Sequence, residues 1–344
     1  MLGIKLRENL FLTFFLILVF LITFNQIDNL ITKKNLKLVE KYDPKPYIFG
    51  SNFIHCIDVS LIENCIEGIE KRKNSKKIVI IGNSQLHHIN RMKENDILIS
   101  EILFKNFIKK DVDIVTLSLP NINLQEVNFI FQKFIKKIEL DYLVISLVFD
   151  DLRETSVRNE LIDFESVDES VDESVDESVD ESVEEYFDAP YKNLLIEKIK
   201  DKISTKKNNF IFHVYNLRNY LFDINSSSKR RIIRSYYNKN LHSYKNMLNQ
   251  NNKNDLKFIS YFAPMRKKPY EIYDYNEYQK FKKDILDINF KFGQKVYDLD
   301  NVVPSKNFDT LDKKNFDYMH FDYHGHKKLS DELENILNTL LKSK

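Results

Sequence analysis

Short runs of aliphatic and β-branched residues recur along the chain and predict buried strands. They lie at residues 77–81, 112–119, 140–149, 256–262 and 295–303. Between them, apolar residues return at helical spacing over residues 124–137, 275–292 and 328–341. Strands that alternate with helices indicate βαβ units, in which a parallel sheet is covered on both faces. We therefore predict an α/β fold, a flavodoxin-like three-layer sandwich with a five-stranded parallel sheet.

One apolar stretch near the N-terminus is too long for a strand. Residues 9–27 contain no charged side chain, and a helix of that length spans roughly 28 Å, enough to cross the hydrocarbon core of a bilayer. The stretch ends in Thr-Phe-Asn-Gln at residues 23–26, which lacks the small residues of a signal-peptide cleavage site. We therefore expect one transmembrane helix, an uncleaved membrane anchor at residues 1–28.

The charges that flank this segment do not define its orientation. Two basic residues precede it and three follow it at residues 33–37, so the positive-inside count does not favour the usual topology. A short N-terminal tail followed by one span and a large domain is nevertheless the ordinary signal-anchor arrangement. We expect a single-pass membrane protein whose large domain is extracytoplasmic.

The rest of the chain divides into a linker and a folded domain. Residues 29–75 are polar, of mixed charge and contain two prolines, which favours a stalk with one short helix around residues 59–71. The α/β pattern occupies residues 76–344. It is interrupted after the third strand by residues 151–255, which we interpret as a large insertion.

An acidic low-complexity repeat lies within that insertion. Residues 166–185 repeat Ser-Val-Asp-Glu four times and end in Ser-Val-Glu-Glu, with ten acidic side chains and no basic one. Without i+4 cations these charges oppose a helix, so a solvated loop is expected. Removing them from a chain of net charge +1 leaves +11 on the rest. We therefore expect the folded part to be basic and to have an anionic neighbour, a lipid or a glycan.

The composition excludes two classes of protein. With 43% hydrophobic and 13% aromatic residues the chain can build a core, which excludes global disorder. Two cysteines exclude a disulfide-rich scaffold. Cys56 and Cys65 are nine residues apart, and this spacing is compatible both with one bridge in an oxidising compartment and with two free thiols.

Two short motifs introduce reactive side chains near the carboxyl ends of strands. Gly-Asn-Ser-Gln at residues 82–85 follows the first core strand, and Asp317 lies three residues before His320, ahead of the last helix. Each is ambiguous alone, because a serine in that position is often a helix N-cap and Asp-x-x-His is common by chance. Together they lie at the edge where parallel α/β sheets position their sites.

These residues resemble the SGNH (GDSL-like) hydrolase superfamily, which has a Gly-Asp-Ser start and an Asp-x-x-His end. Gly82, Ser84, Asp317 and His320 match, on both sides of the insertion. The resemblance implies that Ser84 attacks an ester carbonyl, that His320 moves its proton and that Asp317 fixes the imidazole tautomer. The Ser84 backbone N–H would supply one oxyanion donor.

Three departures from the family concern the surroundings of the nucleophile. Asn83 replaces an aspartate, residues 117–121 lack the glycine of the second family block, and the third block has Asp-Asp at residues 150–151 where the family has Asn-Asp. An ionised aspartate cannot donate a hydrogen bond to an oxyanion. An incomplete oxyanion hole is therefore one alternative. The other is a hole formed by some of the candidates Ser84, Ser118, Asn121 and a protonated Asp150.

Basic residues outside these motifs favour an anionic ligand. Arg153 is the basic residue nearest to the predicted site, and we expect it to bind an anionic group of the substrate. Clusters at residues 229–234 and 266–268 usually form solvated faces, but beside a membrane they would meet anionic lipid or an acidic glycan. No nucleic-acid-binding motif accompanies them, so nucleic acid is not an expected partner.

The histidines do not suggest a metal centre. Three of them at residues 320–326 lie near two aspartates, but they lack the defined turn or i,i+4 spacing of a zinc site. His324 and His326 are expected on different faces of the last helix, and His87 and His88 in a solvated first helical turn. We predict neither a metal nor a cofactor.

Two functional hypotheses follow from the sequence. The first is a membrane-anchored SGNH-like serine esterase or O-acyltransferase acting on an O-acyl ester, and resemblance to anchored relatives of the family suggests an acylated cell-envelope glycan. The second is a catalytically inactive SGNH-like scaffold or polymer-binding component of an envelope assembly, with envelope proteins as partners. The missing oxyanion donors motivate the second hypothesis.

Overall fold

The computed structural model describes residues 46–74, 76–90, 92–162, 229–230, 232–251, 256–266, 272–308 and 317–342. The predicted membrane anchor at residues 1–28 and the acidic repeat at residues 166–185 lie outside these ranges. Of the helices in the described ranges, none combines the length and the apolar character that a membrane span requires.

Seven strands form one sheet in the order β1-β2-β4-β3-β5-β6-β7. Their bounds are β1 Tyr47–Phe49, β2 Asn52–Cys56, β3 Lys76–Gly82, β4 Val112–Ser118, β5 Tyr142–Leu147, β6 Lys257–Phe262 and β7 Lys295–Asp298. Neighbouring strands are parallel except at one edge, where β1 and β2 are antiparallel. The five predicted strands correspond to β3 to β7, and the count of five was wrong because the sheet has two more at that edge.

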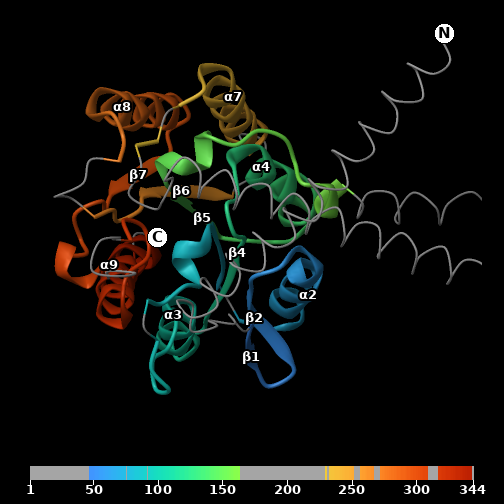
Figure 1. Cartoon of the computed structure of the whole chain (residues 1–344). Helices are drawn as coiled ribbons and strands as arrows, with labels where there is room; N and C mark the ends of the chain where they lie inside the picture. Colours follow the sequence, from blue (N-terminus) through green and yellow to red (C-terminus); the bar gives the residue numbers. More distant parts are fainter. Residues whose placement is uncertain are drawn as a thin grey trace, which may run out of the picture. The chain divides into compact units, whose positions relative to one another are not determined.

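Helices cover both faces of the sheet (Figure 1). Their bounds are α2 Ile62–Lys71, α3 Ile99–Ile108, α4 Leu124–Lys133, α7 Arg234–Asn251, α8 Tyr275–Lys291 and α9 Tyr323–Lys342. Helices α3 and α9 pack together on one face, while α4, α7 and α8 follow one another on the other face with α2 beyond α4. The predicted three-layer α/β arrangement is thus confirmed.

Strands β1 and β2 correct the predicted stalk at residues 29–75. Strand β2 pairs with β4, and α2 packs against both, so the described residues from 46 onward belong to the α/β domain. The sequence pattern missed β2 because His55 interrupts its apolar run. That side chain is fully buried, and both of its ring nitrogens are satisfied there by hydrogen bonds to the hydroxyl groups of Ser100 and Ser118.

The insertion after β5 returns to the domain through α7. This helix has a polar sequence, but Tyr244, Met247 and Leu248 are fully buried and it packs against α4. The Tyr244 hydroxyl is 2.6 Å from the hydroxyl of Ser260 in β6. The C-terminal part of the predicted insertion at residues 151–255 is therefore a helix of the covering layer.

A disulfide joins Cys56 at the end of β2 to Cys65 in α2. Both sulfur-bearing residues are fully buried. The alternative of two free thiols, which the spacing left open, does not apply.

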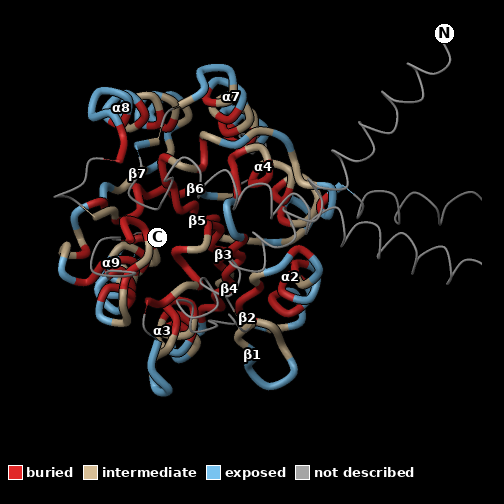
Figure 2. The backbone as a smooth tube through the Cα atoms, viewed as in Figure 1, coloured by how far each residue is buried: buried red, intermediate tan, exposed pale blue. Residues whose placement is uncertain are grey.

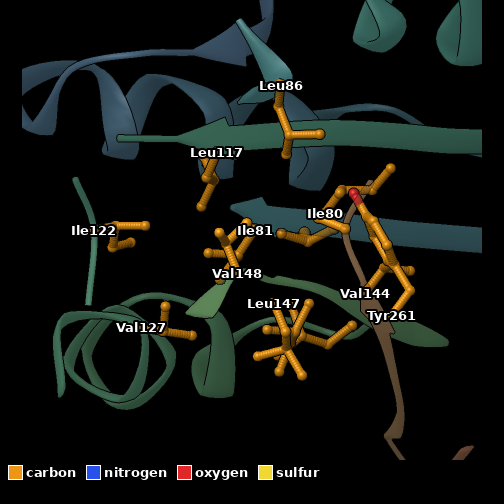
Figure 3. Close-up of a cluster of buried hydrophobic side chains, with 14 of the residues drawn as sticks. Ile80, Ile81, Leu86, Leu117, Ile122, Val127, Val144, Leu147, Val148 and Tyr261 are labelled. Atoms are coloured by element: carbon orange, nitrogen blue, oxygen red, sulfur yellow. The ribbon is translucent and has the colours of Figure 1, made fainter. Parts of the chain in front are cut away.

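The buried core lies along the central strands and beneath their carboxyl ends (Figure 2). Ile81 of β3 lies on one face with Leu117 of β4 and Val127 of α4, whereas Ile80 lies on the other face with Val144 of β5 and Tyr261 of β6, as Figure 3 shows. Because these side chains exclude water on both faces, the ends of β3, β4 and β5 are held in fixed positions. The predicted nucleophile follows β3 directly.

Candidate active site

Ser84 lies in a tight turn directly after β3. The strand ends at Gly82, and the 3-10 turn η2 (Ser84–Leu86) begins two residues later. Asn83 caps this turn, because its side-chain oxygen accepts the backbone N–H of Gln85 at 3.0 Å. Asn83 is therefore the N-cap, and the Ser84 hydroxyl is not used in capping.

Gly82 allows the turn to pack closely on the neighbouring strand. A Cβ atom at this position would lie 2.7 Å from Cδ1 of Leu86 and 2.8 Å from Cβ of Ser146. Both distances are too short for carbon atoms in contact, so a larger residue would displace the turn. The glycine of the motif thus has a steric role next to the nucleophile.

Ser84, His320 and Asp317 form a continuous hydrogen-bonded chain. Ser84 Oγ is 2.8 Å from His320 Nε2, and His320 Nδ1 is 2.9 Å from Asp317 Oδ2. The other carboxylate oxygen of Asp317 accepts the backbone N–H groups of Met319 and His320, both at 2.9 Å. The structure therefore brings the three predicted catalytic residues together in the order that a serine nucleophile, a base and an orienting acid require.

The charge on Asp317 is stabilised by its surroundings. Burial alone would raise the pKa of this carboxyl group, but its hydrogen bonds and its attraction to His320 outweigh that cost and lower the pKa to about 2. The ionised carboxylate accepts a hydrogen bond from the protonated Nδ1 of His320. Nε2 is then left as the acceptor for the Ser84 hydroxyl proton.

Side-chain amides that bind main-chain carbonyl groups hold the nucleophile turn against the histidine loop. Gln85 is fully buried, and its Nε2 donates to the carbonyl oxygens of Pro264 at 2.7 Å and Met319 at 2.8 Å. Asn90 Nδ2 donates to the carbonyl oxygen of His320 at 2.8 Å. Sequence reasoning missed both residues, although the amide next to the nucleophile in the Gly-Asn-Ser-Gln motif was a possible signal.

Two further histidines lie beside this loop and are neutral. The ring centres of His88 and His320 are 4.5 Å apart, and His326 Nε2 is 3.0 Å from the carbonyl oxygen of His88. Burial lowers the pKa of His88 and of His326, each to about 4. His326 is buried and His324 exposed on α9, as expected from their spacing. Of the other residues weighed as a metal set, Asp322 is hydrogen-bonded to Asn307.

The hydroxyl of Ser118 lies in a buried network behind the nucleophile turn. It is hydrogen-bonded to His55 Nε2 and lies 2.8 Å from His87 Nδ1, while His55 Nδ1 is 2.8 Å from the hydroxyl of Ser100. Burial lowers the pKa of His55 well below its ordinary value and that of His87 to about 3. His87 is 4% exposed, so its expected location in a solvated turn was wrong. The Ser118 hydroxyl is thus hydrogen-bonded to two imidazoles, those of His55 and His87.

Asn121 has the backbone conformation of a glycine. Its φ of 51° lies in the left-handed region, which glycine adopts freely and asparagine more easily than most other residues. The second block of the SGNH pattern has a glycine in this part of the chain. Asn121 differs from glycine in sequence, but its backbone has a conformation that glycine also adopts. The Asn121 side chain is exposed and, within the described residues, makes no hydrogen bond to Ser84.

Asp150 accepts hydrogen bonds from three side chains. Arg153 Nη1 donates to its Oδ1 at 2.8 Å, and Arg230 Nη1 and the Tyr318 hydroxyl donate to its Oδ2, the latter at 2.8 Å. Asp150 is thus the acceptor in all three contacts, and none of them presents it as the oxyanion donor that one alternative required. Arg153, predicted to bind substrate, pairs with this carboxylate through one of its nitrogens.

Asp151, the second aspartate of the Asp-Asp pair at residues 150–151, supports the nucleophile turn. It is buried and accepts the side-chain N–H of Asn83 at 3.0 Å and the backbone N–H of Val148 at 2.8 Å. Burial raises the pKa of Asp151 to about 8. Asn83 therefore connects the third block to the turn, since its oxygen caps η2 and its nitrogen binds Asp151.

Comparisons with known proteins find likeness in structure and none in sequence. No family model matches the chain, and no curated protein matches it. Among solved structures it is similar to a GDSL-like lipase from Bacteroides thetaiotaomicron, with 9% identity, a TM-score of 0.43, and coverage of 82% of this chain and 98% of the lipase.

Two other solved structures are similar at the same level. A lipase/acylhydrolase from Enterococcus faecalis has 11% identity and a TM-score of 0.39, with 74% of this chain and 92% of that chain covered. An acetylxylan esterase from Geobacillus stearothermophilus has 7% identity and a TM-score of 0.40, with 75% and 92% covered. All three likenesses concern the fold.

Proposed function

We propose that this protein is a serine esterase of SGNH type that acts on O-acyl esters. The observation that supports this function most directly is the chain of hydrogen bonds from Ser84 Oγ through His320 to Asp317, with distances of 2.8 Å and 2.9 Å. A partly buried serine–histidine–aspartate chain at the carboxyl edge of a parallel sheet is suited to acyl transfer through a covalent intermediate.

The proposed first half-reaction transfers the acyl group to Ser84. His320 Nε2 takes the hydroxyl proton as Oγ bonds to the acyl carbon, and the carbonyl electron pair moves onto oxygen. The tetrahedral intermediate then releases the alcohol, which leaves with the proton from Nε2. Asp317 stabilises the imidazolium between these steps, and the backbone N–H of Ser84 is the first donor to the oxyanion.

The second half-reaction determines whether the enzyme is a hydrolase or an acyltransferase. Water or a hydroxyl group of an acceptor loses its proton to His320 Nε2 and attacks the acyl-serine, and Ser84 is regenerated. We propose an O-acyl group on a cell-envelope polysaccharide as the substrate, either hydrolysed or passed to another hydroxyl. The basic character of the chain outside its acidic repeat supports an acidic polymer.

Membrane attachment is a separate part of the proposal. The uncharged segment at residues 9–27 is long enough for a single span, and we propose that it anchors an extracytoplasmic domain. The Cys56–Cys65 disulfide supports this location, because disulfides persist in oxidising compartments. Protease treatment of sealed cells tests it, since an extracytoplasmic domain is digested without lysis and an intracellular one is protected.

A non-catalytic scaffold is the second candidate. It is favoured by the environment of Asp150, which accepts hydrogen bonds from three side chains where the family has an asparagine donor. A scaffold would retain the fold without a reactive serine.

One experiment separates the two candidates. A neutral fluorophosphonate probe should label the full-length protein at Ser84, and Ser84→Ala should abolish labelling with the unfolding midpoint unchanged. His320→Ala should lower the labelling rate by about 10⁴-fold or more. Equal labelling of wild type and Ser84→Ala, or none of a folded wild type, would favour the scaffold.

A further inference from the structure

We infer that Arg153 and Arg230 form an anion-binding subsite next to the catalytic residues, and that the ester substrate carries a carboxylate or phosphate group that they bind. This inference rests on the proposed esterase function and specifies its substrate class. It starts from the arrangement of the two arginines around Asp150.

Two arginines share one carboxylate. Both bind Asp150, Arg153 through Oδ1 and Arg230 through Oδ2. The next carboxylate, that of Asp317, also attracts Arg230, but its own oxygens are bonded to His320 and to two backbone N–H groups. Within the described part of the site, both guanidinium groups therefore make their direct ionic contact with Asp150.

The arginine pair lies beside the histidine loop. The Tyr318 hydroxyl donates to Asp150 at 2.8 Å, and Tyr318 directly follows the catalytic candidate Asp317. The guanidinium carbon of Arg230 lies 4.4 Å from the centre of the Tyr318 ring, a cation–π contact. Burial would lower the pKa of Arg230, but Asp150 and neighbouring groups raise it, so the side chain stays charged. The subsite is thus attached to the segment that bears the base.

Both arginines can reach a ligand. Their side chains are 28% and 26% exposed, whereas that of Asp150 is 13% exposed, so the carboxylate lies behind the guanidinium groups. Each guanidinium has five N–H donors, and the contact with Asp150 uses Nη1 in both. Donors therefore remain for a second anion.

The chemistry of the subsite selects the ligand. Planar guanidinium groups bind carboxylates and phosphates through paired N–H donors, which lysines cannot do in the same geometry. A third arginine belongs to the same region, since the backbone N–H of Arg266 donates to the carbonyl oxygen of Tyr318 at 2.9 Å. We assign to this subsite an anionic group on the alcohol part of the ester, as in an acylated acidic glycan or a phosphate-containing polymer.

Matched substrates test the inference on the full-length protein. The probes are 3-acetoxybenzoate, 3-acetoxyphenyl phosphate and the neutral methyl ester of the first. We expect wild type to hydrolyse both anionic esters with a KM lower by about tenfold or more than that of the neutral ester. Arg230→Gln and Arg153→Gln should each raise the KM of the anionic esters to about that of the neutral ester measured with the same variant. The control Lys71→Gln removes an exposed charge on α2 and should keep the preference.

The outcomes separate this inference from the proposed function. Equal KM values for neutral and anionic esters in wild type would overturn the subsite. So would variants in which kcat falls equally on all three probes, because that pattern indicates stabilisation of the oxyanion or a structural role. A preference for only one of the two anionic esters identifies carboxylate or phosphate as the natural group.

A binding measurement covers the case in which no ester is hydrolysed. Calorimetric titration of the Ser84→Ala protein with 3-hydroxybenzoate and with inorganic phosphate should show binding of at least one of them that Arg230→Gln weakens by about tenfold. Absence of hydrolysis with such binding would overturn the esterase and retain the subsite. Absence of binding to both anions would overturn the subsite.

Discussion

The side chain of Gln85 donates a hydrogen bond to the carbonyl oxygen of Met319, at a distance of 2.8 Å. These residues are direct neighbours of Ser84 and His320 in sequence, so one amide links the turn that bears the nucleophile to the loop that bears the base. The same amide also binds the carbonyl oxygen of Pro264. The relative position of Ser84 and His320 therefore depends on a side chain that takes no part in the chemistry.

Replacing Gln85 by alanine should impair catalysis more than it impairs folding. Two buried carbonyl groups would lose their donor, which costs about 1–3 kcal/mol in unfolding free energy. Because the Ser84–His320 distance would no longer be fixed, we expect kcat on a neutral ester to fall by about 10²-fold with KM little changed. Gln132→Ala on α4, which also removes an amide, is the control and should keep kcat within about twofold. A loss of stability without a loss of kcat would contradict the positioning role.

The sequence predicts the strands β3 to β7 and the triad because their signals are local. The apolar run before Gly82 and the three-residue spacing of Asp317 and His320 are visible without knowledge of the fold. Strand β2 and helix α7 were missed because their burial depends on partners far along the chain. His55 is buried by contact with Ser118, and Tyr244 by contact with Ser260, and neither contact has a sequence signature.

The contacts of Asp150 also could not be predicted from the sequence. Its three donors come from residues 153, 230 and 318, which only the fold brings together. The sequence indicated that an aspartate replaces a donor of the family, and it left open whether protonation restores one. In the structure Asp150 accepts all three of these hydrogen bonds, so none of them presents it as a donor.

Ser118→Ala should lower stability and leave catalysis largely intact. The hydroxyl is fully buried between His55 and His87, so its removal leaves two neutral imidazoles short of a partner. We expect a loss of about 1–3 kcal/mol in unfolding free energy, measured by urea denaturation. If this hydroxyl donated to the oxyanion instead, kcat on a neutral ester would fall by about 10²-fold or more. A change in kcat of less than about fivefold excludes that role.

The Cys56–Cys65 disulfide should stabilise the edge of the sheet. It closes a short loop between β2 and α2, for which loop entropy predicts about 2–3 kcal/mol. Replacing both cysteines by alanine should lower the unfolding free energy by that amount, and dithiothreitol should destabilise wild type but not the double variant. Labelling of Ser84 by the probe should persist, since neither cysteine contacts the triad. Equal sensitivity of both proteins to the reductant would contradict the prediction.

Asp317→Asn should affect activity and stability with different dependence on pH. An asparagine would donate to Nδ1 of His320 and leave Nε2 protonated, so kcat at neutral pH should fall by about 10⁴-fold. The folded-state pKa of Asp317 is about 2, below its ordinary value of 3.8, so ionisation stabilises the folded protein by roughly 2 kcal/mol at neutral pH. That contribution is complete above about pH 4 and is lost as the pH falls through 2. Urea denaturation should therefore show wild type more stable than the variant at pH 7, with a difference that shrinks towards pH 2. Asp322→Asn, in the same loop but hydrogen-bonded to Asn307, is the control and should retain activity. A stability difference that is constant between pH 7 and pH 2 would show that the charge of Asp317 is not its source.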